Sequence, residues 1–99
     1  MAHTKKAETL AERVQKNIRA LKGLRALSDQ EIADRAGYAT RQAFNHRLSG
    51  RTIPDLDDIE RIAAALEVSP DALLQPLADM TRWMADHPDY RPPKITTFR

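Results

Sequence analysis

The sequence predicts an all-α fold, with five helices in residues 1–75 followed by a short helix and an extended tail in residues 76–99. Apolar residues recur at helical spacings of three and four through most of the first 75 positions. Serine, threonine or aspartate, which cap helix N-termini, stand before four of these stretches. No stretch in this region alternates apolar and polar residues as a half-buried strand does.

The composition limits the class of protein. Its 99 residues are enough for one domain with a single modest core. The absence of cysteine excludes disulfides, thiol catalysis and cysteine-based zinc sites. The sequence has neither the long apolar run of a membrane span nor the apolar stretch of a secretory signal. We therefore expect a cytoplasmic protein.

The first predicted helix covers about residues 6–22, and Gly23 supplies its stop. Its apolar face consists of Leu10, Val14, Ile18 and Leu21. The second helix follows the N-cap Ser28, and Glu31 completes a capping box. Its inward-facing residues are Ile32, Ala33 and Ala36. Gly37 then ends this helix with a left-handed residue.

The third predicted helix follows Thr40 as its N-cap, covers residues 41–49 and ends at Gly50. Phe44 and Leu48 are one turn apart and face inward. The outer side of the helix carries the polar residues Arg41, Gln42, Asn45 and His46. A helix this short therefore presents an unusual amount of hydrogen-bonding capacity to its surroundings.

Two further helices complete the first 75 residues. Asp55 or its neighbour caps the fourth helix. The predicted inner face of this helix consists of Leu56, Ile59, Ile62, Ala63 and Leu66. The fifth helix has Ser69 as its cap and Pro70 at its first position, and Leu73 and Leu74 supply its core contacts.

The charges are divided along the chain. Residues 1–26 hold seven basic residues against two acids, and residues 35–54 hold four arginines and no acid. Residues 55–79 hold seven acids against one arginine. Such a division indicates a positive face for a polyanion. A mixed solvated surface is the alternative.

The second and third helices, joined by a glycine turn, have the arrangement of a helix-turn-helix. Ala33 is small where the next helix crosses close over it, and Gly37 takes the turn conformation. Phe44 and Leu48 anchor the third helix. One face of that helix is left free to enter a DNA major groove.

The segment "LSDQEIADRAGYATRQAFNHRLSGRTIPDLDDIERIAAALEVSPDALL" resembles the Cro/CI-type helix-turn-helix family, also called lambda-repressor-like or XRE regulators. With the first helix, the resemblance covers about residues 8–75. It implies a five-helix DNA-binding domain over residues 1–75, with residues 76–99 as a C-terminal extension.

The sequence departs from the family pattern at three places. Asp29 occupies a position that is often glutamine in the family, and Gln30 comes one residue later. The interval between the glycines, residues 37–50, is one residue longer than usual, and we place the extra residue in the turn. Arg47 falls where the family usually buries an aliphatic residue. Either the stem of Arg47 lies over the core, or the helix is rotated to bury Leu48 instead.

The resemblance places Arg41, Gln42 and Ala43 at the base-reading positions, with His46 one turn further on. Arginine can pair with guanine, glutamine with adenine, and alanine can contact a thymine methyl group. The residues expected at the DNA backbone are Asn45, Arg51, Thr52, Gln30 and Thr40. Tyr38 either packs in the lengthened turn or stacks on a sugar or phosphate.

Catalytic chemistry is not indicated. The three histidines, His3, His46 and His87, lack metal-ligand spacing, and the acids of residues 55–60 lack that of a calcium loop. There is no glycine-rich phosphate loop or nucleophile motif. We therefore expect no enzymatic activity, metal, cofactor or small-molecule ligand.

The C-terminal extension has an apolar stripe that predicts a sixth helix, formed by Leu77, Met80, Trp83 and Met84. The stripe either covers the core of its own domain or forms a dimer interface. Beyond residue 86 the prolines predict an extended chain. There Ile95 and Phe98 lie in "KITTF", which either pairs with a second copy or forms a loose tail.

The sequence thus predicts a regulator that binds double-stranded DNA through the major groove, as a homodimer on a palindromic operator. Its size suggests a phage-type Cro or immunity repressor, acting in the cytoplasm of a bacterium or phage-infected host. The alternative is an antitoxin that binds a toxin through its C-terminal segment and binds DNA to control its own operon.

Overall fold

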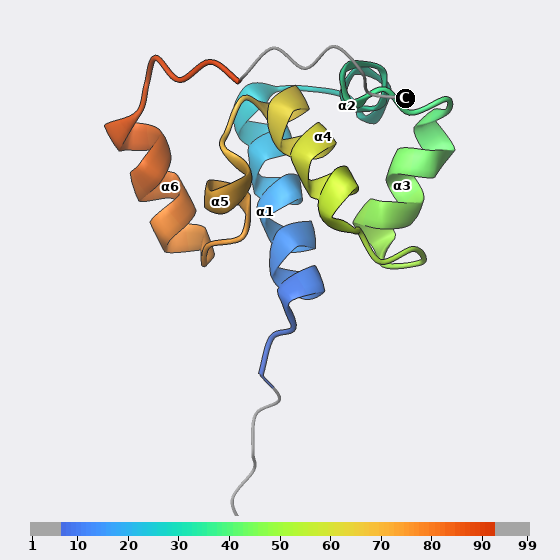
Figure 1. The fold of residues 1–99 in the computed structure, drawn as a ribbon, viewed down its shortest axis with the longest axis horizontal. Helices are drawn as coiled ribbons and strands as arrows, with labels where there is room; N and C mark the ends of the chain where they lie inside the picture. Colours follow the sequence, from blue (N-terminus) through green and yellow to red (C-terminus); the bar gives the residue numbers. More distant parts are fainter. Residues whose placement is uncertain (1–6, 93–99) are drawn as a thin grey trace, which may run out of the picture.

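The computed structural model describes residues 7–92, which form six helices and no strand (Figure 1). These helices are α1 Leu10–Arg25, α2 Asp29–Ala36, α3 Arg41–Ser49, α4 Leu56–Leu66, α5 Pro70–Leu73 and α6 Leu77–Asp86. The predicted all-α class is confirmed. Within residues 7–92, no helix is both long and apolar enough to cross a membrane.

Side-chain caps define the start of α2, α3, α4 and α5, and the four predicted N-caps are confirmed. These caps are Ser28, Thr40, Asp55 and Ser69. Each side-chain oxygen accepts a hydrogen bond from the backbone N–H three residues later, at 2.8–3.1 Å. The bond satisfies an N–H group that has no partner inside the helix.

The bounds of α1 differ from the prediction at both ends. The helix begins at Leu10, because Thr9 is the N-cap. It then runs through Gly23 to Arg25, so the predicted stop at Gly23 is wrong. Ala26 ends the helix instead, in a left-handed conformation with φ of 55°.

Contacts with α4 and α3 hold the last turns of α1 in place. Arg25 donates from Nε to the carbonyl of Leu66 at 3.0 Å, at the C-terminal end of α4. Arg19 donates to the carbonyl of Leu48 at 2.9 Å, near the end of α3. A cation at the negative end of a helix is favourable. The bond from Arg25 ties the turn after Gly23 to α4 and so favours the continuation of α1 past Gly23.

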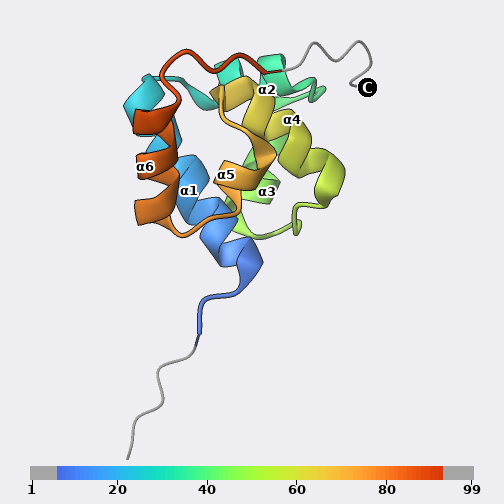
Figure 2. The same ribbon diagram turned by 60° about the vertical axis from the view of Figure 1, so that its left-hand side comes forward.

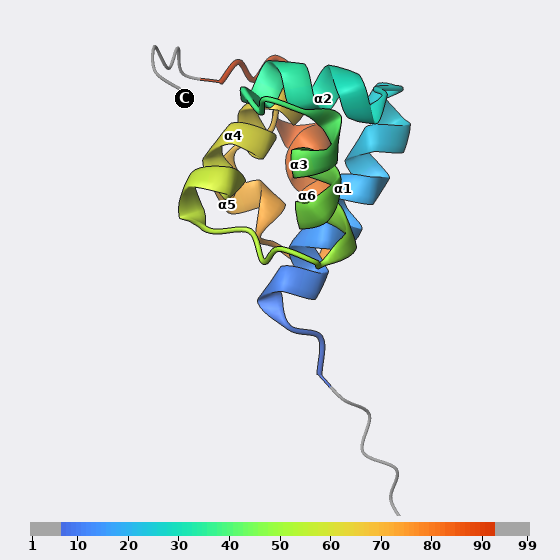
Figure 3. The ribbon, with the colours of Figure 1, turned by 90° about the vertical axis from the view of Figure 1, so that its right-hand side faces the viewer.

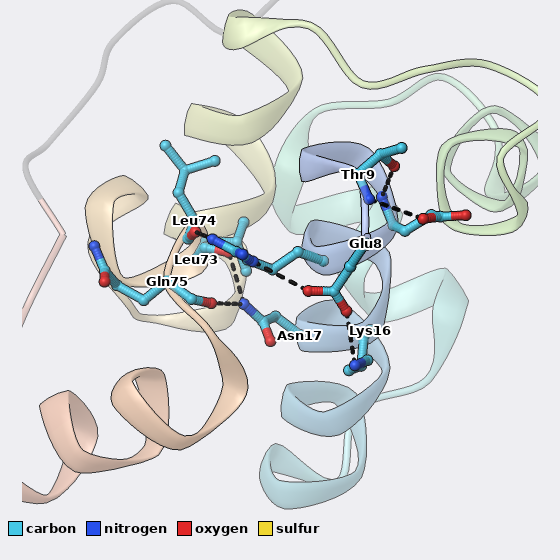
Figure 4. A network of polar contacts seen from close by, with 9 residues as sticks. Glu8, Thr9, Lys16, Asn17, Leu73, Leu74 and Gln75 are labelled. Carbon is cyan, nitrogen blue, oxygen red and sulfur yellow. Dashed lines mark hydrogen bonds and ion pairs between the residues drawn. The ribbon is translucent and has the colours of Figure 1, made fainter. Parts of the chain in front are cut away.

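A buried asparagine of α1 caps α5 in the same way. The Nδ2 atom of Asn17 donates to the carbonyl of Leu73 at 2.8 Å and to that of Gln75 at 2.7 Å (Figure 4). Asn17 is fully buried, so these bonds offset the cost of removing its NH₂ group from water, whereas its Oδ1 has no partner among residues 7–92. Side chains of α1 therefore bind the C-terminal ends of three other helices.

The core contains most of the residues that the helical spacing predicted. Its largest fully buried side chains include Phe44, Ile18, Leu21, Ile32, Ile62, Leu66, Leu73 and Met80. Leu56 was predicted on the inner face of α4 but is 80% exposed. It is the first residue of that helix, in a turn that extends beyond the edge of the core.

The α6 helix packs against α1 and α5, on the opposite side of the bundle from α3 (Figures 1 and 2). Met80 is completely buried and belongs to the core of the same chain. Trp83 and Met84 are half-buried against that core, whereas Leu77 is exposed. Part of the apolar stripe is therefore used within the domain.

Two turn residues provide a paired stability prediction. Gly37 has φ of 83° at the end of α2, and Ala26 has φ of 55° at the end of α1. A side chain strains this left-handed conformation, so Gly37→Ala is expected to lower the free energy of unfolding by about 1 kcal/mol. Ala26→Gly is expected to raise it by about 0.5–1 kcal/mol. Chemical denaturation measures both changes, and a loss of stability in Ala26→Gly would contradict the strain argument.

Candidate nucleic-acid interface

The α2–turn–α3 unit is held by a tight turn and by small residues. At the end of α2 the N–H of Gly37 donates to the backbone carbonyl of Asp34, and the N–H of Tyr38 donates to the backbone carbonyl of Ala33 at 2.9 Å. Ala33 is fully buried, which lets α2 and α3 approach closely. The α3 helix consequently lies on the outside of the bundle, below α2 in Figure 3.

The register of α3 places its apolar and polar residues on different sides. Phe44 is fully buried and Leu48 is 8% exposed. Arg41 and Gln42 are exposed, and His46 is half-buried. Since Thr40 caps the helix and α2 ends at Ala36, residues 37–40 form the turn between α2 and α3.

A polar hollow forms on the outer surface between the start of α2, α3 and the α3–α4 loop. It is lined by Gln30, Arg41, Gln42, Asn45, His46, Ser49 and Arg51. Six of these seven are residues that the sequence predicted to contact DNA. Ser49 was missed, and its position one turn after Asn45 was the available signal. No acidic residue lines the hollow, although the amide of Gln30 donates to Asp34, which lies outside the lining.

Several side chains of the hollow are available to a ligand. Within residues 7–92, no hydrogen bond or ion pair involves the side chain of Arg41, Gln42 or Arg51. Gln30 donates to its neighbour Asp34 at 2.9 Å, which leaves its amide oxygen available.

The Oδ1 atom of Asn45 is buried and has no hydrogen-bond partner among residues 7–92. The exposed and unpaired side chains of the hollow are those of Arg41, Gln42 and Arg51.

The remaining predicted site residues lie around or away from the hollow. Ala43 is half-buried on α3, and the hydroxyl of Thr40 accepts from the N–H of Ala43 at 3.1 Å. Thr52 is half-buried in the loop after α3, where its N–H donates to the carbonyl of His46 at 2.9 Å. Two proposed interface residues lie outside the described residues, namely Ile95 and Phe98.

Comparison with known proteins bears on this arrangement. A family model described as a helix-turn-helix domain matches residues 17–77, more than half of the chain. The chain belongs to the helix-turn-helix family. The predicted membership of a helix-turn-helix DNA-binding family is thereby confirmed, and the XRE-type resemblance is compatible with it.

A solved structure supports the same assignment. The chain is similar to a hypothetical transcription factor, NHTF, from Neisseria, with a TM-score of 0.68 and 26% sequence identity. The match covers 83% of this chain and 93% of that one. A comparison with curated proteins gave no match.

One arginine of the helix-turn-helix unit has a structural role. Arg47 donates from Nε to Asp58 Oδ1 at 3.1 Å and from Nη1 to the carbonyl of Ala43 at 2.8 Å. Its guanidinium also lies over the Tyr38 ring, 5.0 Å from the centroid. Leu48 is buried, as the second alternative for this position expects, and the guanidinium of Arg47 is held by Asp58 and by the carbonyl of Ala43. Arg47 therefore faces α4, away from the polar hollow.

Asp58 is the centre of this contact between the turn, α3 and α4. Its carboxylate accepts from the Tyr38 hydroxyl at 2.6 Å and from the N–H of Asp55 at 3.1 Å, besides Arg47. Burial raises the pKa of Asp58, but the hydrogen bonds from these three donors outweigh burial, and the pKa lies below its usual value. Burial and the bond to Asp58 raise the pKa of Tyr38. Tyr38 thus packs within the protein, and the network fixes α3 against α4.

The basic side chains of α1 already form ion pairs or hydrogen bonds within the protein. These residues are Arg13, Lys16, Arg19, Lys22 and Arg25. Two of them pair with Glu8 and one pairs with Asp29, at 2.7–3.1 Å, while the other two bind helix carbonyls. The charge of residues 1–26 therefore contributes less to a positive face than its count implies. Lys5 and Lys6 lie outside the described residues.

Proposed function

We propose that the chain is a sequence-specific transcription regulator that binds DNA with the outer face of α3 in the major groove. The observation that carries the proposal is the acid-free hollow, where Arg41 and Gln42 are exposed at the start of α3 without a partner among residues 7–92. In helix-turn-helix domains, the first residues of the second helix are the ones that reach base edges.

The residue types in the hollow suit different parts of DNA. Arg41 can donate two bonds to guanine, and Gln42 can pair with adenine. Ala43 and His46 are placed to contact neighbouring bases. The residues proposed at the DNA backbone are Asn45, Arg51, Thr52, Gln30 and Thr40. In this assignment Arg47 holds α3 in place and makes no DNA contact.

The proposed assembly is a homodimer on a palindromic operator. One recognition helix reads few bases, so two copies on inverted half-sites provide useful affinity and specificity. The description of the Neisseria relative as a hypothetical transcription factor supports a role in transcription. The proposed type is a compact phage-type Cro or immunity repressor that works in the cytoplasm.

Selection of bound duplexes from a random DNA pool tests the proposal. The expected result is an enriched motif in two inverted halves, with centres about 10 bp apart because two recognition helices then meet the same face of the duplex. Enrichment of no motif would refute sequence-specific binding. A single half-site would leave the DNA-binding role but contradict the palindrome.

Salt dependence separates the proposed backbone contacts from the base contacts. The affinity for the selected duplex is expected to fall steeply with salt, because phosphate contacts release counterions. Arg51→Ala is expected to reduce the slope of log K against log salt concentration by about 1 and to weaken binding to all DNA sequences equally. Fluorescence anisotropy at several salt concentrations measures this slope. Arg82→Ala on α6 is the matched control, and an equal change there would contradict the assignment.

A second candidate keeps the DNA binding but adds a protein target. An antitoxin would bind its toxin through the C-terminal segment, and α6 has a hollow that suits a basic partner. The hollow includes Asp71, Asp79, Arg82, Trp83 and Asp86. Native mass spectrometry of the chain purified from its own cells distinguishes the two candidates, because a repressor gives homomers and an antitoxin gives a complex with a second protein.

A further inference from the structure

One side of α1 borders both ends of the helix-turn-helix unit. Gln15, Arg19 and Lys22 follow one another at spacings of four and three, so they lie on the same side of α1. Gln15 lies against Gly50, because a Cβ atom built on that glycine would be 3.4 Å from the amide nitrogen of Gln15. Arg19 binds the last turn of α3, and Lys22 binds the first residue of α2. This side of α1 therefore connects the end of α3 with the start of α2, and α1 lies next to α3 in Figure 3.

Arg19 has unused hydrogen-bonding capacity and an unpaired charge. Its Nη2 atom donates to the carbonyl of Leu48 at 2.9 Å. A guanidinium has five N–H donors, so this one bond leaves most of them free. Three of the other basic side chains of α1 pair with carboxylates, whereas Arg19 forms no ion pair within residues 7–92. The residue is exposed, so its free donors and its charge are accessible from solvent.

The bond to Leu48 places this guanidinium beside the polar hollow. Ser49 and Arg51, which follow Leu48 closely in the chain, both line the hollow. The α3 helix has nine residues and is therefore about 13 Å long, similar to the major groove width of about 12 Å. When the first turn of α3 reaches base edges, its last turn lies near the edge of the groove, where the phosphates are. A side chain of α1 at that turn faces the DNA backbone.

We propose that Arg19 binds a DNA phosphate with the N–H groups that the Leu48 carbonyl leaves free, so that one guanidinium joins the end of α3 to the DNA backbone. This inference rests on the proposed binding of α3 in the major groove. Arginine suits both acceptors, because its planar set of donors can serve a carbonyl and a phosphate at the same time. A phosphate contact contains no sequence information. Arg19 is therefore a positioning residue, which adds affinity and holds α3 in register without selecting a base.

Salt dependence separates this role from a purely structural one. Arg19→Gln keeps an N–H donor for the Leu48 carbonyl but removes the charge. The variant is expected to bind all duplexes more weakly, with the slope of log K against log salt concentration reduced by about 1. The ratio of parent to variant affinity should therefore fall about threefold between about 50 and 200 mM salt. Fluorescence anisotropy measures both quantities, and the base preference should be that of the parent.

Arg25→Gln is the matched control. Arg25 also lies on α1 and donates to the carbonyl at the end of another helix, but it does not line the hollow. This variant is expected to keep the slope of the parent, even where its stability falls. Arg19→Lys restores the charge and should restore the slope. A parental slope in Arg19→Gln, or an equal reduction in Arg25→Gln, overturns the proposal.

A second substitution at the same position separates charge from helix capping. Arg19→Met keeps the aliphatic stem but has neither the charge nor a donor for the Leu48 carbonyl. It is expected to be less stable than Arg19→Gln and to show the same reduced slope. Circular dichroism at the assay temperature verifies that each variant is folded. A slope that follows stability instead of charge across these variants would mean that Arg19 acts only within the protein.

Uncharged phosphates locate the contact on the DNA. Single phosphates of the selected duplex are replaced in turn by methylphosphonates, and each duplex is titrated with the parent and with Arg19→Gln. One position is expected to weaken binding of the parent but not of Arg19→Gln, because the two changes remove the same contact. Arg51→Ala should lose its response at a different phosphate. Identical profiles for the parent and Arg19→Gln contradict the inference.

The two proposals fail in different ways. Phosphate contacts do not depend on sequence, so the salt series on a duplex of arbitrary sequence tests Arg19 even if selection enriches no motif. A reduced slope for Arg19→Gln in that series supports the inference although the proposed sequence-specific function is wrong. An enriched motif together with a parental slope for Arg19→Gln supports the function and overturns the inference.

Discussion

Arg41→Ala is expected to weaken binding to the selected operator by about 1–3 kcal/mol, which is roughly five- to 150-fold. The side chain is exposed at the first position of α3 and lines the hollow, where it can donate two bonds to one guanine. The variant should also lose its preference at that base pair, because an alanine distinguishes no base there. Titration of the parent operator and of its single-base variants measures both effects. Gln42→Ala is expected to show a loss of similar size at an adenine.

Two controls separate base reading from charge. Arg41→Lys keeps the positive charge but loses the planar pair of donors, so it should recover part of the affinity and little of the base preference. Arg82→Ala removes an exposed arginine of α6, remote from the hollow, and should leave binding to the operator nearly unchanged. Equal operator affinity of the parent and Arg41→Ala would refute the recognition assignment.

Asp58→Asn is expected to lower the free energy of unfolding by about 2–3 kcal/mol at neutral pH, since bonds to a charged group are the strong ones. The side chain of Asp58 is only 7% exposed and accepts from Tyr38, Arg47 and the N–H of Asp55. The neutral amide of the introduced asparagine cannot form the ion pair that the carboxylate of Asp58 forms with Arg47. Thermal and chemical denaturation measure the loss.

The pH dependence identifies the carboxylate as the cause. The pKa of Asp58 is lowered in the folded protein from its ordinary value of 3.8, so its stabilisation is fully present above that value. Stability should fall as pH drops below 3.8 toward the folded pKa, and this contribution should be missing in Asp58→Asn. Asp57→Asn is the matched control, because the side chain of Asp57 is 58% exposed and makes one ion pair, with Arg61 on the same helix. A loss in Asp57→Asn as large as that in Asp58→Asn would contradict the role of burial.

Local signals in the sequence predicted most of the helix starts. A cap such as Ser28 or Thr40 acts on an N–H three residues away, so both partners are visible in a short stretch of sequence. The turn after α2 was predicted for the same reason, from Gly37 alone. Phe44 and Leu48 also followed from spacing, because a helix of fixed period places them on one side.

The errors occurred where distant residues decide the structure. Gly23 is a reasonable stop for an isolated helix, but Arg25 binds the carbonyl of Leu66, which is 41 positions away in the sequence. Leu56 has the spacing of an inward residue, yet the first turn of α4 projects past the core. The helical period predicts which side of a helix a residue lies on, but it does not predict whether a neighbouring helix extends far enough to cover that residue.

The candidate site shows the same limit. The polar residues of the hollow were predictable because most of them belong to one short helix. The role of Arg47 was not, since Asp58 and Tyr38 come from the next helix and the preceding turn. The sequence therefore showed four arginines in one acid-free segment, and the contacts distinguish the one that faces α4 from those that face outward.

The capping contacts of α1 limit which part of this protein can be transferred to another protein and still hold its structure. Asn17, Arg19 and Arg25 each close the end of a different helix. The α2–turn–α3 unit includes the proposed base contacts and most of the proposed backbone contacts, but not Arg51 and Thr52 of the following loop or the groups that hold the end of α3. If this unit were moved into another protein, α3 would keep its DNA-binding side chains but would lose the contact from Arg19 that holds its C-terminal end. A designer who wants to change operator preference should exchange side chains on the surface of α3 and keep the whole domain as the frame.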